Sequence, residues 1–337
     1  MMKEVTSPFT GGKVIRKIDN LEYTYRGVVI NAPTVYYLCV DTNEEFTDGE
    51  LDEFNLEVIH NEFRIKEGIP LVHEIKGIRA KYGLSAAKMS RILGFGINTY
   101  SNYEKGEMPS VANGRIIAMC ANPTYFKDYV VSLSNLDADE KMKTLSLVNK
   151  CIEEVKPDVV QYRCFEKDLY NWERANIYSG YSELSVPKAK EMVYYFSSLL
   201  KPFTTKLNKL LFYADFLFFQ KYKKSITGMN YIAIQKGPVP NKFDTLYDQA
   251  KHIDKVLVKF DANVMGCRFE GKESHSFNRD LFSDEELEVI KMVGDRFTYT
   301  KTNDMVELSH LEPAWLDNIE EMSLIPYSYA LTLMGIE

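Results

Sequence analysis

Two short runs near the start of the chain are rich in β-branched and aromatic residues, LEYTYRGVVI at 21–30 and TVYYLCV at 34–40. Such runs are typical of β-strands, and the NAP between them consists of turn-forming residues. Apolar residues then recur every three or four positions over 48–63: Leu51, Phe54, Val58 and Ile59. The first 66 residues are therefore predicted to form a small antiparallel sheet followed by a helix.

From 67 to 130 the apolar spacing becomes that of several short helices, closed by glycine or proline. The stretch LSAAKMSRILGFGINTYSNYEKG, residues 84–106, contains two of them, joined by a turn with Gly94 and Gly96. Its apolar residues fold both helices onto one core: Leu84, Met89, Leu93, Phe95, Tyr100 and Tyr103. This spacing predicts a helix-turn-helix, whose second helix enters the DNA major groove.

Polar and basic side chains are expected on the outer face of this motif. Short polar groups on the second helix suit base edges, and Asn pairs bidentately with adenine, while basic groups contact phosphates. The candidate DNA-binding residues are Lys88, Arg91, Asn98, Thr99, Ser101, Asn102 and Lys105. The alternative is a plain helical bundle with these residues facing solvent. One module makes few contacts, so we expect a homodimer that reads two half-sites of operator DNA.

The charge distribution supports this assignment. The whole chain has a formal net charge of −7, yet 68–130 contain eight Lys and Arg against four Asp and Glu. Residues 1–66 contain seven against twelve. Salt screens fields beyond about 8 Å in the cell, so the local excess decides what this region attracts. The region that contains the motif therefore has a net positive charge, although the whole chain has a net negative charge.

A charged helical connector is predicted over 131–180. Its apolar stripe is Met142, Leu145, Val148, Ile152 and Val155, ended by Pro157. A stripe of this kind is either a face packed on the core or a dimer seam.

The remainder, 181–337, is predicted to be mostly helical. Its most hydrophobic run, LLFYADFLFF at 210–219, is interrupted by Asp215 and is shorter than the roughly 20 residues of a membrane span. SITGMNYIAIQKGPVP at 225–240 predicts a turn, a short strand and a rigid Gly-Pro corner. Ser283 and Glu286 form a capping box that begins a later helix. The expected fold class is mainly α with small antiparallel β elements.

No catalytic or metal-binding pattern is visible. The five histidines are isolated, and the sequence contains no nucleophile motif and no phosphate loop. Five cysteines without a C-x-x-C pair indicate reduced thiols. We expect no enzyme, no cofactor, no metal and no membrane contact. The chain begins without a secretory signal, which favours the cytoplasm.

The stretch at 84–106 resembles the helix-turn-helix family that includes phage repressors, although Ala86 stands where that family often has a phosphate-binding Gln. Together with EYTYRGVVINAPTVYYLCVDTNEEFTDGELDEF, it also resembles MqsA-type antitoxins, in which a sheet and a helix precede the motif. That resemblance implies that Asn98 reads a base, and that a contact is weakened or replaced at Asn102, where the family often has Arg. The family's zinc site is not expected, since this region offers only Cys39 and His60 as ligands.

Three further segments resemble, in order, the Panacea or SocA-like antitoxin domain: KLNKLLFYADF at 206–216, SITGMNYIAIQKGPVP at 225–240 and LSHLEPAW at 308–315. The resemblance implies a mostly helical domain with a small sheet that binds and neutralises a toxin encoded beside it. The candidate toxin-binding residues are Lys206, Lys209, Asp215, Lys236 and Pro238. A structural hydrogen bond or ion pair for Asp215, a solvated face for the two helix lysines and a rigid turn for GPVP remain open.

Four regions result: a zinc-free MqsA-like β domain at 1–66, a lambda-repressor-like helix-turn-helix DNA-binding domain at 67–130, a helical connector at 131–180 and a Panacea toxin-neutralising domain at 181–337. The sequence predicts an antitoxin that neutralises a cognate protein toxin and represses its own operon. The alternative is a DNA-binding regulator whose C-terminal domain senses a ligand or acts as a proteolytic adaptor.

Overall fold

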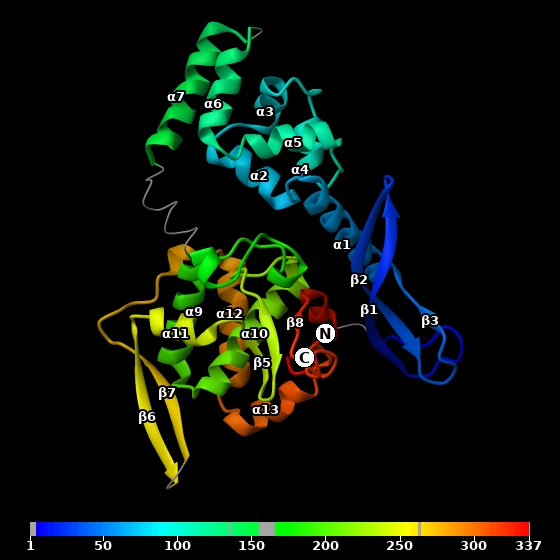
Figure 1. The fold of residues 1–337 in the computed structure, drawn as a ribbon, viewed down its shortest axis with the longest axis vertical. Helices are drawn as coiled ribbons and strands as arrows, with labels where there is room; N and C mark the ends of the chain where they lie inside the picture. Colours follow the sequence, from blue (N-terminus) through cyan, green and yellow to red (C-terminus); the bar gives the residue numbers. More distant parts are fainter. Residues whose placement is uncertain (1–4, 135, 155–165, 262–263, 337) are drawn as a thin grey trace. The chain divides into compact units, whose positions relative to one another are not determined.

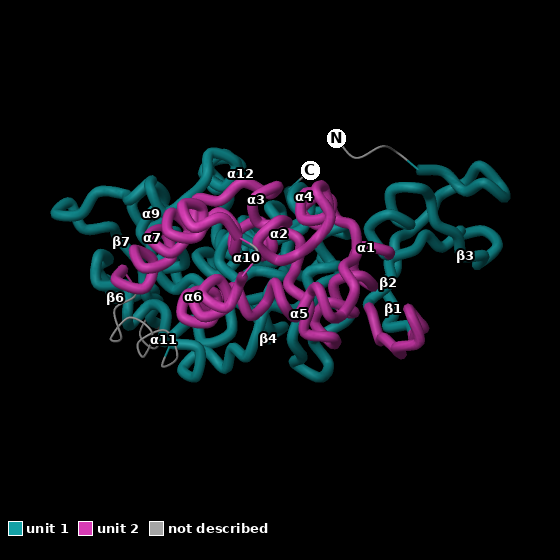
Figure 2. Tube along the Cα trace, turned by 90° about the horizontal axis from the view of Figure 1, so that it is seen from above, with its two compact units in different colours: residues 1–21, 33–55, 166–337 teal, residues 22–32, 56–165 magenta. Residues whose placement is uncertain are grey.

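The computed structural model describes residues 5–134, 136–154, 166–261 and 264–336. Over these residues the chain is mainly α-helical with small antiparallel β elements, which confirms the fold class (Figure 1). The chain divides into two compact units (Figure 2). Unit 1 comprises 1–21, 33–55 and 166–337; unit 2 comprises 22–32 and 56–165. The expected DNA-binding region lies wholly in unit 2, and the expected toxin-neutralising region lies wholly in unit 1.

The N-terminal strands form a three-stranded sheet in the order β1–β2–β3: β1 (Val14–Tyr25), β2 (Val28–Cys39) and β3 (Glu45–Phe46). The sheet was expected, but the turn predicted at NAP is wrong. The chain turns at Arg26 and Gly27, whose φ angles of +49° and +79° suit a two-residue hairpin turn. NAP lies inside β2.

Pro33 is tolerated in β2 because β3 does not reach it. The β3 strand pairs only with Tyr37 and Leu38. Pro33, which lacks an N–H group, therefore needs to donate no hydrogen bond on the β3 side of β2. At Val35 the side-chain amide of Asn55 takes the place of a neighbouring strand. Val35 N donates to Asn55 Oδ1 over 2.9 Å, and Asn55 Nδ2 donates to Val35 O over 2.8 Å. Asn55 belongs to the predicted helix, α1 (Gly49–Glu67).

Unit 2 contains the short helices predicted for 67–130 and the predicted connector helix, together with a helix at Pro123–Ser132 that was not predicted. They are α2 (Val72–Lys81), α3 (Ala86–Ile92), α4 (Thr99–Glu104), α5 (Val111–Met119), α6 (Pro123–Ser132) and α7 (Ala138–Glu154). Their shared core contains Tyr82, Met89, Tyr100, Ile117 and Phe126. The expected α7 stripe is split, since Val148 is buried in this core while Met142 is 65% exposed. Val155 lies outside the described residues.

The C-terminal part of unit 1 surrounds one buried helix. Its elements are η1 (Ile177–Ser179), α9 (Val186–Leu200), α10 (Thr204–Tyr222), β4 (Tyr231–Ile234), β5 (Gly237–Pro240), α11 (Phe243–Gln249), β6 (Ile253–Asp261), β7 (Val264–Gly271), η2 (Arg279–Leu281), α12 (Asp284–Phe297), α13 (Thr302–His310), α14 (Pro313–Leu316), β8 (Leu324–Ile325) and η3 (Tyr327–Thr332). Helix α10 contacts α9, α12, α13, β5, β7 and η3 (Figure 1).

The GPVP segment is a strand, which corrects the expectation of a rigid turn. It forms β5 at the edge of the sheet β5–β4–β8 and pairs antiparallel with β4. An edge strand tolerates Pro238 and Pro240, since one side needs no partner. The turn falls instead between the two strands, at Gln235 and Lys236.

The structure also describes the predicted capping box and most of the cysteines. The capping box at the start of α12 is confirmed, because Glu286 N donates to Ser283 Oγ and Ser283 N donates to Glu286 Oε2. The cysteines that the structure describes are free thiols, while Cys164 lies outside the described residues. Among the described helices, none is both long and apolar enough to span a membrane.

Candidate functional site

Helices α3 and α4, for which the sequence predicts a helix-turn-helix, pack against each other in unit 2. Gly94 ends α3 with a φ of +71°, a left-handed conformation that favours glycine. Gly96 serves a different purpose, since a Cβ there would lie 3.0 Å from Thr99 Oγ1. The first glycine therefore reverses the chain, and the second leaves room for the first turn of α4.

A buried serine on α3 fixes the start of α4. Ser90 is fully buried, and its Oγ accepts a 2.9 Å hydrogen bond from Tyr100 N in the first turn of α4. Asn98 occupies the N-cap position but makes no side-chain capping bond. Because Ser90 satisfies this part of the helix end, the Asn98 amide is left exposed.

Two further contacts hold α4 from its buried side. The Tyr100 hydroxyl donates to Ile75 O of α2 over 2.8 Å. Arg79 of α2 pairs with Glu104 at 2.6 Å, with side chains only 19% and 13% exposed. The hydrogen bond to Glu104 raises the pKa of the Arg79 guanidinium, so the guanidinium stays charged. The position of α4 is thus set by side chains that cannot themselves reach a ligand.

The candidate DNA-binding residues lie on α3, α4 and the turn between them. Asn98, Asn102 and Lys105 are exposed, and Lys88, Thr99 and Ser101 are half-buried. Arg91 is exposed but already forms an ion pair with Glu140 of α7. A phosphate contact from Arg91 would therefore compete with an internal partner.

Sequence reasoning missed Ile97. This side chain is 82% exposed, directly before Asn98 and at the leading corner of α4. The sequence did contain a signal for it: Ile97 is apolar, yet it does not fit the spacing of the apolar residues that form the core of this region. Apolar groups in this position can contact the methyl group of thymine.

In unit 1 the candidate toxin-binding residues have structural partners. Lys206 is 7% exposed and donates to Phe297 O and Thr300 O, over 2.8 and 2.6 Å, where α12 ends. Lys209 is fully buried and donates to Pro238 O over 2.9 Å. Pro238 is itself buried, whereas Lys236 is exposed. Of these four, only Lys236 can touch a partner at the surface.

Asp215 organises the segment between α10 and β4. It is fully buried, and its carboxylate accepts from Ile226 N and Thr227 N, both over 2.9 Å. Thr227 Oγ1 and Tyr231 OH donate to its other oxygen, over 2.5 and 2.8 Å. Burial raises the pKa of Asp215 to about 6, against the lowering effect of these hydrogen bonds. The structural alternative for Asp215 fits this geometry better than a surface contact.

Lys209 fills a confined space beneath β5. A Cβ added at Gly237 would come within 2.8 Å of Lys209 Nζ and 2.4 Å of Ser309 Oγ. Burial lowers the pKa of Lys209 to about 7. Glycine at 237 therefore allows β5 to lie directly on the ammonium group.

Two further polar residues in this region were missed from the sequence. Asn208 Oδ1 accepts a 2.5 Å hydrogen bond from Tyr247 OH of α11. Glu312 is fully buried and accepts from Tyr213 OH, Met334 N and Gly335 N over 2.8 to 3.0 Å. We call Lys206, Asn208, Lys209 and Asp215 the α10 polar cluster, since each links α10 to a different segment of unit 1. Within the part of the chain that the structure describes, no three His, Cys, Asp or Glu side chains are placed to hold a metal ion.

The comparisons with known proteins bear on this second site. Residues 207–316 match a family model described as "Antitoxin SocA-like, Panacea domain". No curated protein and no solved structure matches the chain. The matched range contains Asn208, Lys209, Asp215, Gly237 and Glu312, so it supports the resemblance of the three C-terminal segments. The MqsA-like resemblance of the N-terminal half stays a prediction.

Proposed function

We propose that this chain is the antitoxin of a toxin–antitoxin system. Unit 1 binds and neutralises a cognate protein toxin, and unit 2 represses the operon by binding operator DNA as a homodimer. The observation that carries the proposal is the antitoxin-domain match over 207–316. The exposed Asn98 and Asn102 on a firmly anchored α4 support the DNA-binding part.

The toxin contact is proposed for exposed side chains above the α10 polar cluster. The cluster residues bond to backbone groups or, in the case of Asn208, to the Tyr247 hydroxyl of the chain itself. Removing a buried hydrogen-bonding group costs about 1–3 kcal/mol. Lys236, exposed in the turn between β4 and β5, is the remaining charged candidate. In this proposal the α10 polar cluster stabilises the fold of unit 1, and exposed side chains of unit 1 contact the toxin.

Co-expression with a toxin-sized neighbouring gene tests this proposal. We expect growth to be rescued and the two proteins to co-purify. Lys236→Glu is expected to weaken co-purification, because a charge reversal at a contact is costly. Lys301→Glu, at another exposed lysine of unit 1, should not. Growth arrest in spite of well-folded antitoxin would contradict the toxin-neutralising role.

A regulator that senses a ligand is the second candidate, favoured by a cavity in unit 1. The cavity has a volume of about 960 Å³ and is lined by Tyr37, Phe54, Leu217, Lys221 and Leu333, among others. Small-molecule sites have volumes of roughly 300–1,000 Å³. This candidate requires operator affinity to change when a small molecule is added in the absence of any toxin. We propose no catalytic role, since the buried Lys209 and Asp215 serve the chain's own backbone.

A further inference from the structure

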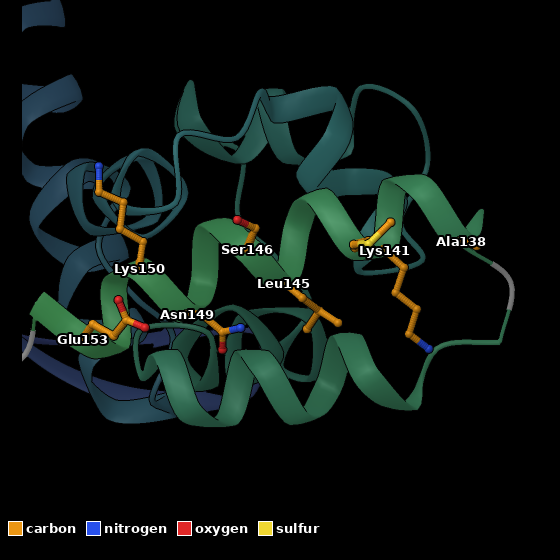
Figure 3. Close-up of a pocket in the computed structure, with 8 residues that line it drawn as sticks. Ala138, Lys141, Leu145, Ser146, Asn149, Lys150 and Glu153 are labelled. Atoms are coloured by element: carbon orange, nitrogen blue, oxygen red, sulfur yellow. The ribbon is translucent and has the colours of Figure 1, made fainter.

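Helix α7 has one face in the core of unit 2 and a more exposed face beside it. Thr144, Val148 and Cys151 point into the core. On the other side a shallow hollow follows the helix, and its lining comes entirely from α7 (Figure 3). Met142, which lines this hollow, is 65% exposed.

The residues along the hollow follow the spacing of a coiled-coil seam. Ala138, Met142, Leu145 and Asn149 are separated by four, three and four residues. This alternation corresponds to successive d and a positions of a heptad, with Asn149 at an a position. Figure 3 shows Leu145, Asn149 and Glu153 following one another along the helix. The stripe differs from the predicted one, since Val148 belongs to the core and Leu145 borders the hollow while also packing against that core.

Asn149 indicates what covers this seam. It is half-buried, and among the described residues its amide makes no hydrogen bond. An amide carries both donors and an acceptor, so it is satisfied by a second Asn directly opposite. A parallel, in-register pair of α7 helices places Asn149 opposite Asn149. An antiparallel pair would place it opposite an apolar d residue such as Leu145.

We propose that α7 is a dimerisation helix, whose seam packs in parallel and in register on the same seam of a second copy, with the two Asn149 amides paired. This inference deepens the proposed function, because a repressor of two half-sites needs a second copy. The core contacts of α7 pre-form the helix, so association does not have to fold it. A 17-residue helix is about 25 Å long. One helix face of that length is smaller than a standard interface of about 800 Å² per partner. The dimer is therefore weak and concentration-dependent without DNA.

Disulfide trapping of the full chain tests the register. Asn149→Cys brings two thiols together across the proposed axis, and mild oxidation with copper phenanthroline in air should convert most of the protein to twice the chain mass. Lys143→Cys is the matched control, because Lys143 is exposed on the same helix about 100° away from Met142. It should stay at the chain mass, as should the wild type with its native cysteines. Equal cross-linking of both variants, or none at position 149, would overturn the proposal.

Sedimentation without added oxidant gives an independent readout. The wild type should show a monomer–dimer equilibrium, and Met142→Glu should remove the dimer while circular dichroism stays unchanged. If the wild type and Met142→Glu sediment identically as monomers at every concentration tested, the proposed seam is wrong. Both assays are done without DNA. A dimer that fails to bind operator would contradict the proposed repression and leave the α7 interface standing.

Discussion

Just before α4 begins, Ile97 presents a large apolar side chain to solvent beside the exposed Asn98 amide. We predict that Ile97 contacts a thymine methyl group in the operator. Replacing that thymine with deoxyuridine removes only the methyl group, worth about 0.8 kcal/mol, and should weaken wild-type binding roughly three- to fivefold. For Ile97→Ala the same replacement should have no effect.

The control for this experiment is Met119→Ala, which changes another exposed apolar residue of the bundle, 60% exposed at the end of α5. It should respond to deoxyuridine as the wild type does. Affinities from fluorescence anisotropy decide the matter. An equal response of Ile97→Ala and the wild type at every thymine would disprove the contact.

Lys209 predicts a specific pH dependence of stability. Burial lowers its folded pKa to about 7, from 10.5 for an ordinary lysine, so above pH 7 the folded state binds fewer protons than the unfolded state. The energetic cost of burying Lys209 is therefore complete below pH 7 and declines as the pH rises towards 10.5. The wild type should gain about 2 kcal/mol relative to Lys209→Met between pH 7 and 9.

Urea unfolding at pH 7, 8 and 9 measures this difference. Lys236→Met, at an exposed lysine of the neighbouring turn, is the control and should follow the wild type at each pH. A constant difference between wild type and Lys209→Met would show that Lys209 keeps its proton, contrary to the account.

The partners of the buried Asp215 and Lys209 could not be predicted from the sequence. The position of Asp215 within an apolar helix was visible, and so was the alternative of a structural hydrogen bond. Its donors were not, because Ile226, Thr227 and Tyr231 return to Asp215 only after the chain leaves α10. Burial of Lys209 was equally hidden, since it depends on glycine at 237 and on the path of β5.

At the scale of elements, the placement of α4 depends on Ser90. Ser90→Ala leaves the Tyr100 N–H buried without its acceptor and should cost about 1–3 kcal/mol of unfolding free energy. Operator affinity should fall as well, because α4 loses its attachment to α3. Chemical denaturation and anisotropy measure the two effects.

Ser85→Ala is the matched control for this substitution. Ser85 caps α3 by accepting from Lys88 N over 3.2 Å, and its loss should cost about 1 kcal/mol. Operator binding should survive, since α4 keeps its own anchor. A Ser90→Ala variant that binds operator like the Ser85→Ala variant would contradict the role of Ser90.

The helices were predictable and the strands less so. Apolar spacing and stop signals located α1, α3, α4, α10 and α12, because helices depend on local periodicity. The turn predicted at NAP was wrong, since Asn55 replaces a strand partner beside Pro33 and lets β2 continue. GPVP was expected to be a turn because prolines suggest one, yet an edge strand accommodates them.

For the whole molecule, two activities are proposed for two compact units. Unit 2 contains the basic region at 68–130, whose local excess of Lys and Arg separates it from the net charge of −7. The sequence indicated this division through charge and through the three Panacea-like segments. It did not indicate that residues 22–32 belong to unit 2 and 33–55 to unit 1, because contacts between distant segments decide this.

The most direct test of the account measures operator binding and toxin neutralisation in one variant, Asn98→Ala with Asn102→Ala. Each specific base contact contributes about 1–3 kcal/mol, so losing two of them should lower operator affinity by at least about 30-fold. Growth rescue from the co-expressed toxin should match the wild type, with an unchanged melting curve. Loss of both activities in a folded protein, or unaltered operator affinity, would contradict the division of labour between the two units.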